Sequence, residues 1–187
     1  MRKIGLCVTG SFCTFSSLLN VVDELVQAGY DIVPVFSYNV SELDTRFFKQ
    51  SDFERIIVEK TGKIPVKTIV GAEALTKSGI ELMLVAPCTG NTLAKIAHGI
   101  TDTPVTMAVK ATLRTDKPVV LSVSSNDALG ANAKNIGTLL NTKNVYLVPL
   151  GQDAPKGKPH SLIADTSLVL STIEKAFAGE QIQPVIL

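Results

Sequence analysis

The stretch GIELMLVAPCTGNTLAKIAHG (residues 79–99) joins a strand to a helix through a short polar segment. Its apolar run is typical of a strand that is buried on both faces, and the proline after it ends the strand. Residues 91–98 have the spacing of a helix that ends at a glycine. Between the two lie small donor and acceptor residues, Thr89, Asn91 and Thr92, and Asn91 is the expected N-cap. We expect an anion-binding segment here, because neutral donors at the start of a helix hold anions.

Strand-like and helix-like segments alternate along the rest of the chain. The apolar runs predict strands over residues 3–10, 31–37, 79–87, 117–124 and 144–150. The helical patterns predict helices over residues 12–28, part of 40–60, 91–98, 128–140 and 161–178. Pro34 predicts an edge strand or a bulge, and the Pro- and Gly-rich loop 151–161 is expected to be irregular. This order predicts right-handed crossovers and a mainly parallel sheet with helices on both faces.

The composition is that of a globular protein. The chain has 187 residues, which fits a single domain over residues 1–187 whose core needs no disulfide or metal. A net charge of +1 argues against nucleic acid as a partner, and no run reaches the ~18 apolar residues of a membrane helix. Cys7, Cys13 and Cys88 are odd in number and widely spaced, which predicts reduced thiols in a cytoplasmic protein and no metal site.

Two further strand ends carry small polar residues. Gly10 and Ser11 follow the first strand, where backbone N–H groups favour an anion, although the spacing is not that of a dinucleotide fingerprint. The alternative is a cap, in which Ser11 or Thr14 accepts a hydrogen bond from the next helix. Ser37 follows the second strand, with a simple turn residue as the alternative. Since ligands bind at the carboxyl ends of parallel strands, we expect these residues to converge with segment 86–92.

The segment PCTGNTLAKIAHGITD (residues 87–102) resembles a signature of the homo-oligomeric flavin-containing cysteine decarboxylase superfamily. The residues that match are Pro87, Thr89, Asn91, Thr92, Ala94, Lys95, Ala97, Gly99 and Asp102. The segment VTGS and Ser37 match other flavin-binding segments of the superfamily, and the resemblance spans about residues 3–150. It implies a flavodoxin-like, three-layer αβα fold of the Rossmann type that binds FMN.

The resemblance also implies which residues contact the cofactor. Those expected to bind FMN are Gly10, Ser11, Phe12, Ser37, Pro87, Thr89, Gly90, Asn91, Thr92 and Ser124. Hydroxyls and backbone amides can hold the phosphate dianion of FMN, and a site that holds phosphate alone is the weaker form of this expectation. In the superfamily a neighbouring subunit completes the flavin site. A trimer-based homo-oligomer, up to a dodecamer, is therefore expected.

Three features depart from the decarboxylases of the superfamily. Glu73 stands near the position of their catalytic histidine, and VSSN (residues 123–126) replaces their Pro-Ala-Met-Asn segment and keeps only Asn126. No cysteine follows Cys88 to match the one in their late clamp. These departures argue against decarboxylation of peptidyl-cysteine or phosphopantothenoylcysteine, and they leave the catalytic residues unassigned.

The late loop offers a different kind of substrate contact. Lys156, Lys158 and His160 lie within five residues and could neutralise a small dicarboxylate, with Asn126 as a further amide donor. The alternative is a solvated basic loop with no binding role.

Two later segments, residues 124–140 and 149–165, resemble one particular branch of the superfamily. The resemblance to that branch implies that the chain is an oxidoreductase subunit in the mother-cell cytoplasm of a sporulating bacterium. It would help to oxidise a dihydropyridine-type dicarboxylate with FMN as hydride acceptor, and it would pair with a second, nicotinamide-binding subunit. Two alternatives stay open: a non-catalytic assembly partner with a relict flavin pocket, and a flavin-modifying or decarboxylating enzyme with another substrate.

Overall fold

The computed structural model describes the chain over residues 1–187, apart from the side chain of Thr76. Its centre is a seven-stranded sheet with strand order β2-β1-β3-β4-β7-β6, in which β5 also pairs with β4. The strands are β1 (Lys3–Val8), β2 (Asp31–Phe36), β3 (Leu82–Thr89), β4 (Val119–Ser125), β5 (Val145–Leu147), β6 (Leu150–Gly151) and β7 (Leu162–Ala164). All pairs among β1 to β5 are parallel, and β7 is antiparallel to β4 and β6. The predicted, mainly parallel sheet is confirmed.

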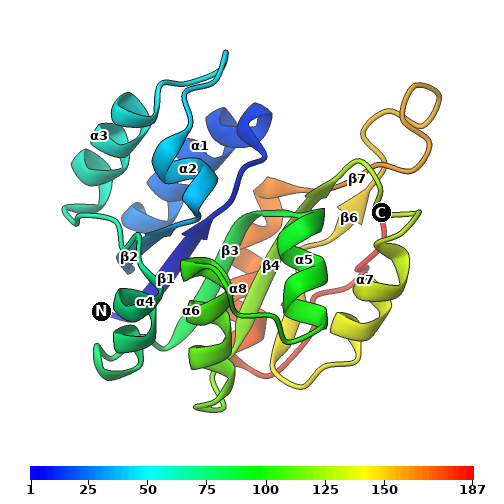
Figure 1. Ribbon diagram of the computed structural model, residues 1–187. Helices are drawn as coiled ribbons and strands as arrows, with labels where there is room; N and C mark the ends of the chain where they lie inside the picture. The colour runs from blue at the N-terminus through cyan, green and yellow to red at the C-terminus, as the bar shows by residue number, and fades with distance from the viewer.

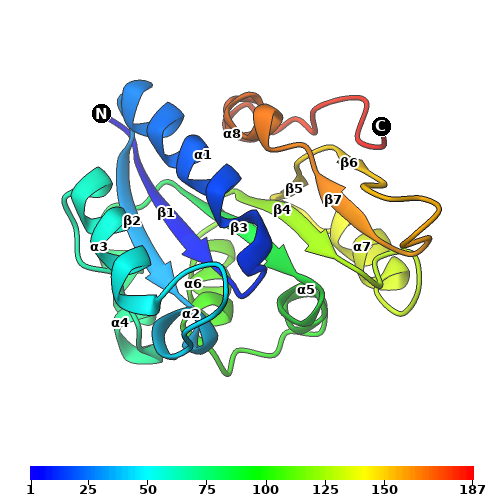
Figure 2. The same cartoon turned by 90° about the horizontal axis from the view of Figure 1, so that it is seen from above.

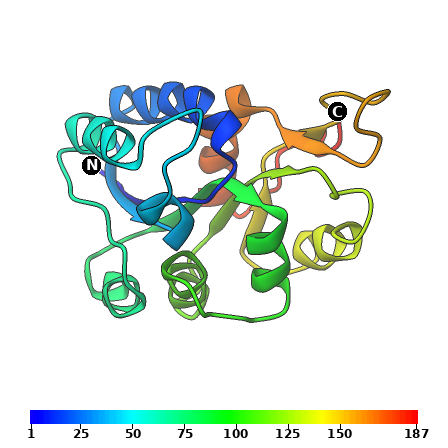
Figure 3. The ribbon, with the colours of Figure 1, turned by 45° about the horizontal axis from the view of Figure 1, so that its top comes forward.

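Helices cover both faces of this sheet. They are α1 (Phe15–Gln27), α2 (Tyr38–Glu42), α3 (Gln50–Thr61), α4 (Ile69–Ala74), α5 (Gly90–Ala97), α6 (Pro104–Leu113), α7 (Ala133–Leu140) and α8 (Val169–Phe177). Figures 2 and 3 show α1, α3 and α8 on one face of the sheet and α4, α5, α6 and α7 on the other. This is the three-layer αβα arrangement that the resemblance implied.

The core lies on both faces of the central strands β3 and β4. β3 is buried at every position except its last, so its apolar run follows from helices on both faces. On the α1 side, Phe15 stacks on Phe53 with ring centroids 4.2 Å apart. β2 lies at the edge of the sheet, which confirms the prediction from Pro34.

Residues 161–178 do not form the single helix that their pattern predicts. β7 comes first, a short 3-10 helix (Thr166–Leu168) follows, and α8 begins only at Val169. Within β7, Ile163 pairs with Ser124 of β4 and with Gly151 of β6. The prediction was wrong because pairing with strands distant in sequence overrode the local helical pattern.

The helix predicted over residues 128–140 and the strand predicted over 144–150 are both shorter than expected. α7 starts at Ala133, because the preceding residues form a turn in which the N–H groups of Gly130 and Asn132 donate to the carbonyl of Asp127. The predicted strand divides into β5 and β6 around Pro149, which has no N–H to donate.

The apolar pattern predicts neither α4 nor α6. A signal for α6 was nevertheless present, since Thr103 and Thr106 form a capping box around Pro104 at the helix start. α4 is a short helix that packs on α6, and its six residues carry too little periodicity to be recognised.

Candidate functional site

The carboxyl ends of β1, β2, β3 and β4 lie at one edge of the sheet, at the top of Figure 1. Two hollows open there, with volumes of about 310 Å³ and about 520 Å³. Gly10, Thr89 and Asn91 line both, so the hollows adjoin and form one groove. The first hollow lies beside α2, and the second lies beside the turn of residues 126–132. Residues from separate strand ends therefore meet, as the parallel topology requires.

Ser37 lines the first hollow with a hydroxyl that no other group in the chain uses. It precedes α2 but makes no side-chain capping bond, and its Oγ is buried without a hydrogen-bond partner. Buried polar groups are almost always hydrogen-bonded. The turn-residue alternative thus leaves this hydroxyl unexplained.

Ser11 and Ser124 join the ends of β1 and β4. Their hydroxyl oxygens lie 2.8 Å apart, within hydrogen-bond distance, and both residues line the second hollow. Neither Ser11 nor Thr14 caps a helix with its side chain, and the Thr14 hydroxyl instead donates to the carbonyl of Ser11 at 2.8 Å. The capping alternative for these two residues is therefore wrong.

The N-cap of α5 is Thr89, so the prediction of Asn91 was wrong. Thr89 Oγ1 accepts a hydrogen bond from the N–H of Thr92 at 3.3 Å. A register shift in β3 after Val85 brings the N–H of Thr89 to within 3.0 Å of Thr9 Oγ1, whose hydroxyl donates to the carbonyl of Pro87 at 2.7 Å. Asn91 is left with an exposed side chain at the junction of the two hollows.

Asp127 and Asn132 also line the second hollow, and sequence reasoning missed both. Ser125 Oγ donates to Asp127 Oδ1 at 2.5 Å, and Asn132 Nδ2 donates to both oxygens of Asp127 at 2.9 and 3.0 Å. These hydrogen bonds lower the pKa of Asp127, and the bond from Ser125 has the largest effect. A serine two residues before an aspartate at a strand end was the available signal, since such pairs close tight turns.

Gly90 is the residue that lets this cluster lie against α5. A Cβ at Gly90 would lie 2.5 Å from Ser125 Oγ, 2.7 Å from Asn132 Nδ2 and 2.9 Å from Asp127 Oδ1. The glycine in the predicted motif is therefore required by close packing, and its conformation is not a left-handed one.

Lys95 is the charged residue of the first hollow. Its Nζ lies 2.9 Å from both oxygens of Asp102. This ion pair ties α5 to the segment that follows it and places a cation beside the groove.

Two residues predicted to bind the cofactor, Phe12 and Pro87, do not line the groove. Phe12 packs on Phe15 with ring centroids 5.2 Å apart, although its ring edge lies beside Gly10. Pro87 lines a separate cavity of about 80 Å³ between the sheet and α1. Ser124 lines this cavity as well as the second hollow.

The three basic residues predicted for a dicarboxylate line neither hollow. Lys156, Lys158 and His160 are exposed on a loop that projects beyond the sheet at the upper right of Figure 1. Lys158 Nζ lies 3.5 Å from Asp153, and the carbonyl of His160 accepts a hydrogen bond from the N–H of Leu129. That bond ties the loop to the turn beside the second hollow, whereas Asn126 lines the hollow directly.

This groove occurs in a chain with clear relatives. A family model described as Flavoprotein matches residues 1–173. The chain belongs to the Flavoprotein family. The B subunit of dipicolinate synthase from Bacillus subtilis is 42% identical over 187 residues, which are 100% of this chain and 94% of that protein.

Solved structures agree with this assignment. The crystal structure of the B subunit of dipicolinate synthase from Bacillus halodurans is 42% identical, with a TM-score of 0.92 over 100% of this chain and 96% of that one. The FMN-dependent cysteine decarboxylase SpaF has a TM-score of 0.70 at 20% identity, over 96% of this chain and 97% of that one. The likeness to SpaF concerns the fold alone. Together the two solved structures confirm the predicted flavodoxin-like fold class.

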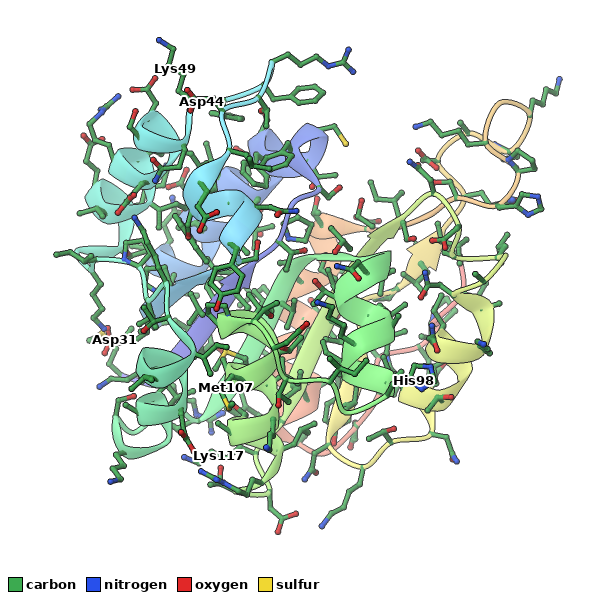
Figure 4. All side chains as sticks on the ribbon, in the orientation of Figure 1. Asp31, Asp44, Lys49, His98, Met107 and Lys117 are labelled. Carbon is green, nitrogen blue, oxygen red and sulfur yellow. The ribbon has the colours of Figure 1, made fainter. Side chains whose placement is uncertain are left out.

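Glu73 and His98 lie outside the groove of this flavoprotein-family chain. Glu73, at the position implied for a catalytic histidine, is on α4 and lies 4.0 Å from Arg114. His98 is the C-cap of α5, at the end of the helix away from Gly90 (Figure 4).

The cysteines are free thiols, as expected. Cys7 and Cys88 are buried, and Cys13 is exposed. Burial raises the pKa of the Cys88 thiol to about 12 and raises that of Cys7 too. Both buried thiols therefore stay protonated and act as small apolar side chains.

The described part of the chain has neither a metal-ligand cluster nor a membrane-spanning helix. Over the described side chains, no three His, Cys, Asp or Glu residues group as ligands for a metal ion. None of the described helices has both the length and the apolar character needed to cross a bilayer.

Proposed function

We propose that this chain is the B subunit of a dipicolinate synthase. In this role it binds FMN in the groove and contributes to the oxidation of a dihydrodipicolinate-type intermediate to dipicolinic acid during sporulation. Similarity over the full chain to the B subunit from Bacillus subtilis supports the substrate class. The unpartnered hydroxyl of Ser37 in a groove of small neutral donors is the observation that carries the cofactor proposal.

The residues present fit FMN. The phosphate would enter the first hollow, where Ser37 Oγ lacks a partner, Gly10 leaves the backbone accessible and Lys95 adds a positive charge. The larger second hollow would take the flavin ring and the substrate against Ser11, Asn91 and Asn126. Neutral hydroxyls and amides, with backbone dipoles, are sufficient to hold a phosphate dianion.

FMN, when bound, would supply an acceptor for the hydride (two electrons and one proton) that leaves a dihydropyridine ring as it becomes aromatic, and the second proton would be released from the ring to solvent. The chain itself would bind and orient. Asn126 and Asn91 offer amide N–H groups to a carboxylate at the second hollow. The loop with Lys156, Lys158 and His160 would add positive charge where this loop, or that of a neighbouring copy, reaches the groove. No catalytic base is assigned.

The proposal extends to partners and compartment. The chain would act as one domain over residues 1–187, in trimer-based homo-oligomers up to a dodecamer, together with the A subunit of dipicolinate synthase. Its place would be the cytoplasm of the mother cell. A small dicarboxylate is the proposed substrate.

A second candidate is a non-catalytic partner of the A subunit, with a pocket that holds only phosphate. It is favoured by one observation: the charged side chains that line the two hollows, Lys95 and Asp127, are both engaged with other residues of the chain. A flavin-dependent decarboxylase with another substrate is the third candidate.

The first experiment is a visible spectrum of the protein from a flavin-replete host. Bands near ~370 and ~450 nm, or their appearance after FMN is added, support the proposal. Anaerobic addition of the dihydropyridine dicarboxylate should then bleach the ~450 nm band. A colourless protein that refuses FMN contradicts the proposal and favours the second candidate, whereas a coloured protein that is not bleached favours the third.

Ser37 provides a matched pair of variants for the cofactor site. Ser37→Ala should weaken FMN binding about tenfold or more, since it removes a hydrogen bond to a charged phosphate. Ser41→Ala is the control, because Ser41 Oγ is also buried and unpartnered but does not line the first hollow. Fluorescence titration with FMN measures both. Equal affinities in the two variants would remove Ser37 from the site.

A further inference from the structure

Asp127 is the single charged residue among the side chains described along the second hollow. Ser125 and Asn132 hold its carboxylate in one orientation, and Asn135 Nδ2 in turn donates to Asn132 Oδ1 at 2.9 Å. Three side chains from the end of β4 and the start of α7 thus support one carboxylate.

The hydrogen bonds leave part of this carboxylate available. Oδ1 accepts from both Ser125 and Asn132 and lies against Gly90, whereas Oδ2 accepts only from Asn132. A carboxylate oxygen can accept more than one hydrogen bond. The residue as a whole is exposed at the edge of the groove, so Oδ2 can meet a ligand that enters the second hollow.

Donors from the protein keep Asp127 ionised. The bonds from Ser125 and Asn132 lower its pKa below the ordinary value of 3.8. The nearest cation of the groove, Lys95, lines the other hollow and is paired with Asp102. A dianionic ligand in the second hollow would therefore meet a negative charge that no lysine of the hollow offsets.

We propose that Asp127 is a specificity-determining residue that selects a dicarboxylate whose ring nitrogen carries a proton. A protonated ring nitrogen would donate to Asp127 Oδ2 and offset the repulsion between the carboxylates. This inference rests on the proposed function, because it takes the second hollow as the place of the substrate ring. An aromatic product, whose ring nitrogen has lost its proton, forfeits the same bond and is released more readily.

Two simple probes distinguish a ring nitrogen that carries a proton from one that does not. Piperidine-2,6-dicarboxylate has a protonated ring nitrogen at neutral pH, whereas pyridine-2,6-dicarboxylate does not. Both carry two carboxylates in the same positions on a six-membered ring. Calorimetric titration of the FMN-loaded full chain with each probe gives the ratio of their affinities.

We expect the wild type to bind the piperidine compound about tenfold or more tightly than the pyridine compound, as a charge-assisted hydrogen bond would produce. Asp127→Asn should bring the ratio close to one. Asp116→Asn is the matched control: it removes the same charge from an exposed site that pairs with Lys143, and should leave the ratio unchanged. Thermal denaturation of each variant verifies that it is folded.

Several outcomes overturn the inference. A wild type without preference, a preference that survives in Asp127→Asn, or no binding of either probe each excludes Asp127 as the selecting residue. FMN titration of the same wild-type and variant proteins, before they are loaded with FMN, is the separate arm. If Asp127→Asn alone loses affinity for FMN, the N–H group that donates to Asp127 belongs to the flavin ring and not to the substrate. That result also overturns the inference. Normal FMN binding with no probe preference leaves the cofactor proposal intact, whereas failure of the wild type to bind FMN contradicts the proposed function itself.

Discussion

The packing of the Asp127 cluster against α5 can be tested by adding one methyl group. In Gly90→Ala the new Cβ would lie less than 3.0 Å from three polar atoms, with Ser125 Oγ the closest at 2.5 Å. Ser125 and Asn132 cannot move aside independently, because both are bonded to the same carboxylate of Asp127. Relief of the contact must therefore disturb at least one of these hydrogen bonds.

The expected change in stability combines two opposing effects. Overpacking of a well-filled site lowers the free energy of unfolding by about 1–3 kcal/mol. Replacing glycine by alanine in a helix raises it by roughly 0.5–1 kcal/mol. We therefore expect Gly90→Ala to lower the free energy of unfolding by about 1 kcal/mol relative to the wild type.

Gly137→Ala is the matched control. Gly137 also lies in a helix, α7, but a Cβ there would meet no atom within 4 Å. It should raise the free energy of unfolding by roughly 0.5–1 kcal/mol, so the two variants should differ by about 2 kcal/mol. Urea denaturation at one protein concentration, followed by circular dichroism, measures this difference.

A double variant identifies the origin of the effect. Gly90→Ala combined with Ser125→Ala removes the oxygen nearest to the new methyl group, and the two changes should be less destabilising together than their separate effects sum to. If Gly90→Ala is as stable as Gly137→Ala, the described contact between α5 and the Asp127 cluster is incorrect.

Three further predictions concern the cap of α5, the three cysteines and Asp127. Thr89→Ala should lower the free energy of unfolding by about 1 kcal/mol through loss of the α5 cap, whereas Asn91→Ala should change it little; equal effects in urea denaturation would contradict the assignment of the cap. In the native protein a thiol reagent should label Cys13 and leave the two buried cysteines unmodified until urea is added, as counted by mass spectrometry; labelling of all three without urea would refute their burial. Because the pKa of Asp127 is lowered in the fold, its stabilising contribution is present above pH 3.8 and is lost as pH falls through the folded-state value. Asp127→Asn should therefore lose less stability in acid than the wild type does. A pH profile of thermal denaturation identical to that of the wild type would argue against a lowered pKa of Asp127.

The sequence alone determined the fold class and the location of the groove. The apolar run of β3 is typical of a strand covered on both faces, and alternation with helices indicates parallel strands. Parallel strands end at one edge, so Gly10, Ser37 and Asn91 had to meet. The resemblance of residues 87–102 to a flavin-binding signature indicated the family without any structure.

The tertiary structure alone decided which small polar residues are already used by the fold. Thr89 caps α5 and Thr9 holds β1 to β3, whereas the hydroxyl of Ser37 has no partner. It also placed β7 against β4 and brought Asp127 to Gly90. The physical reason is that a hydrogen bond between residues distant in sequence depends on how strands pair and turns close, and a local pattern of residue types records neither.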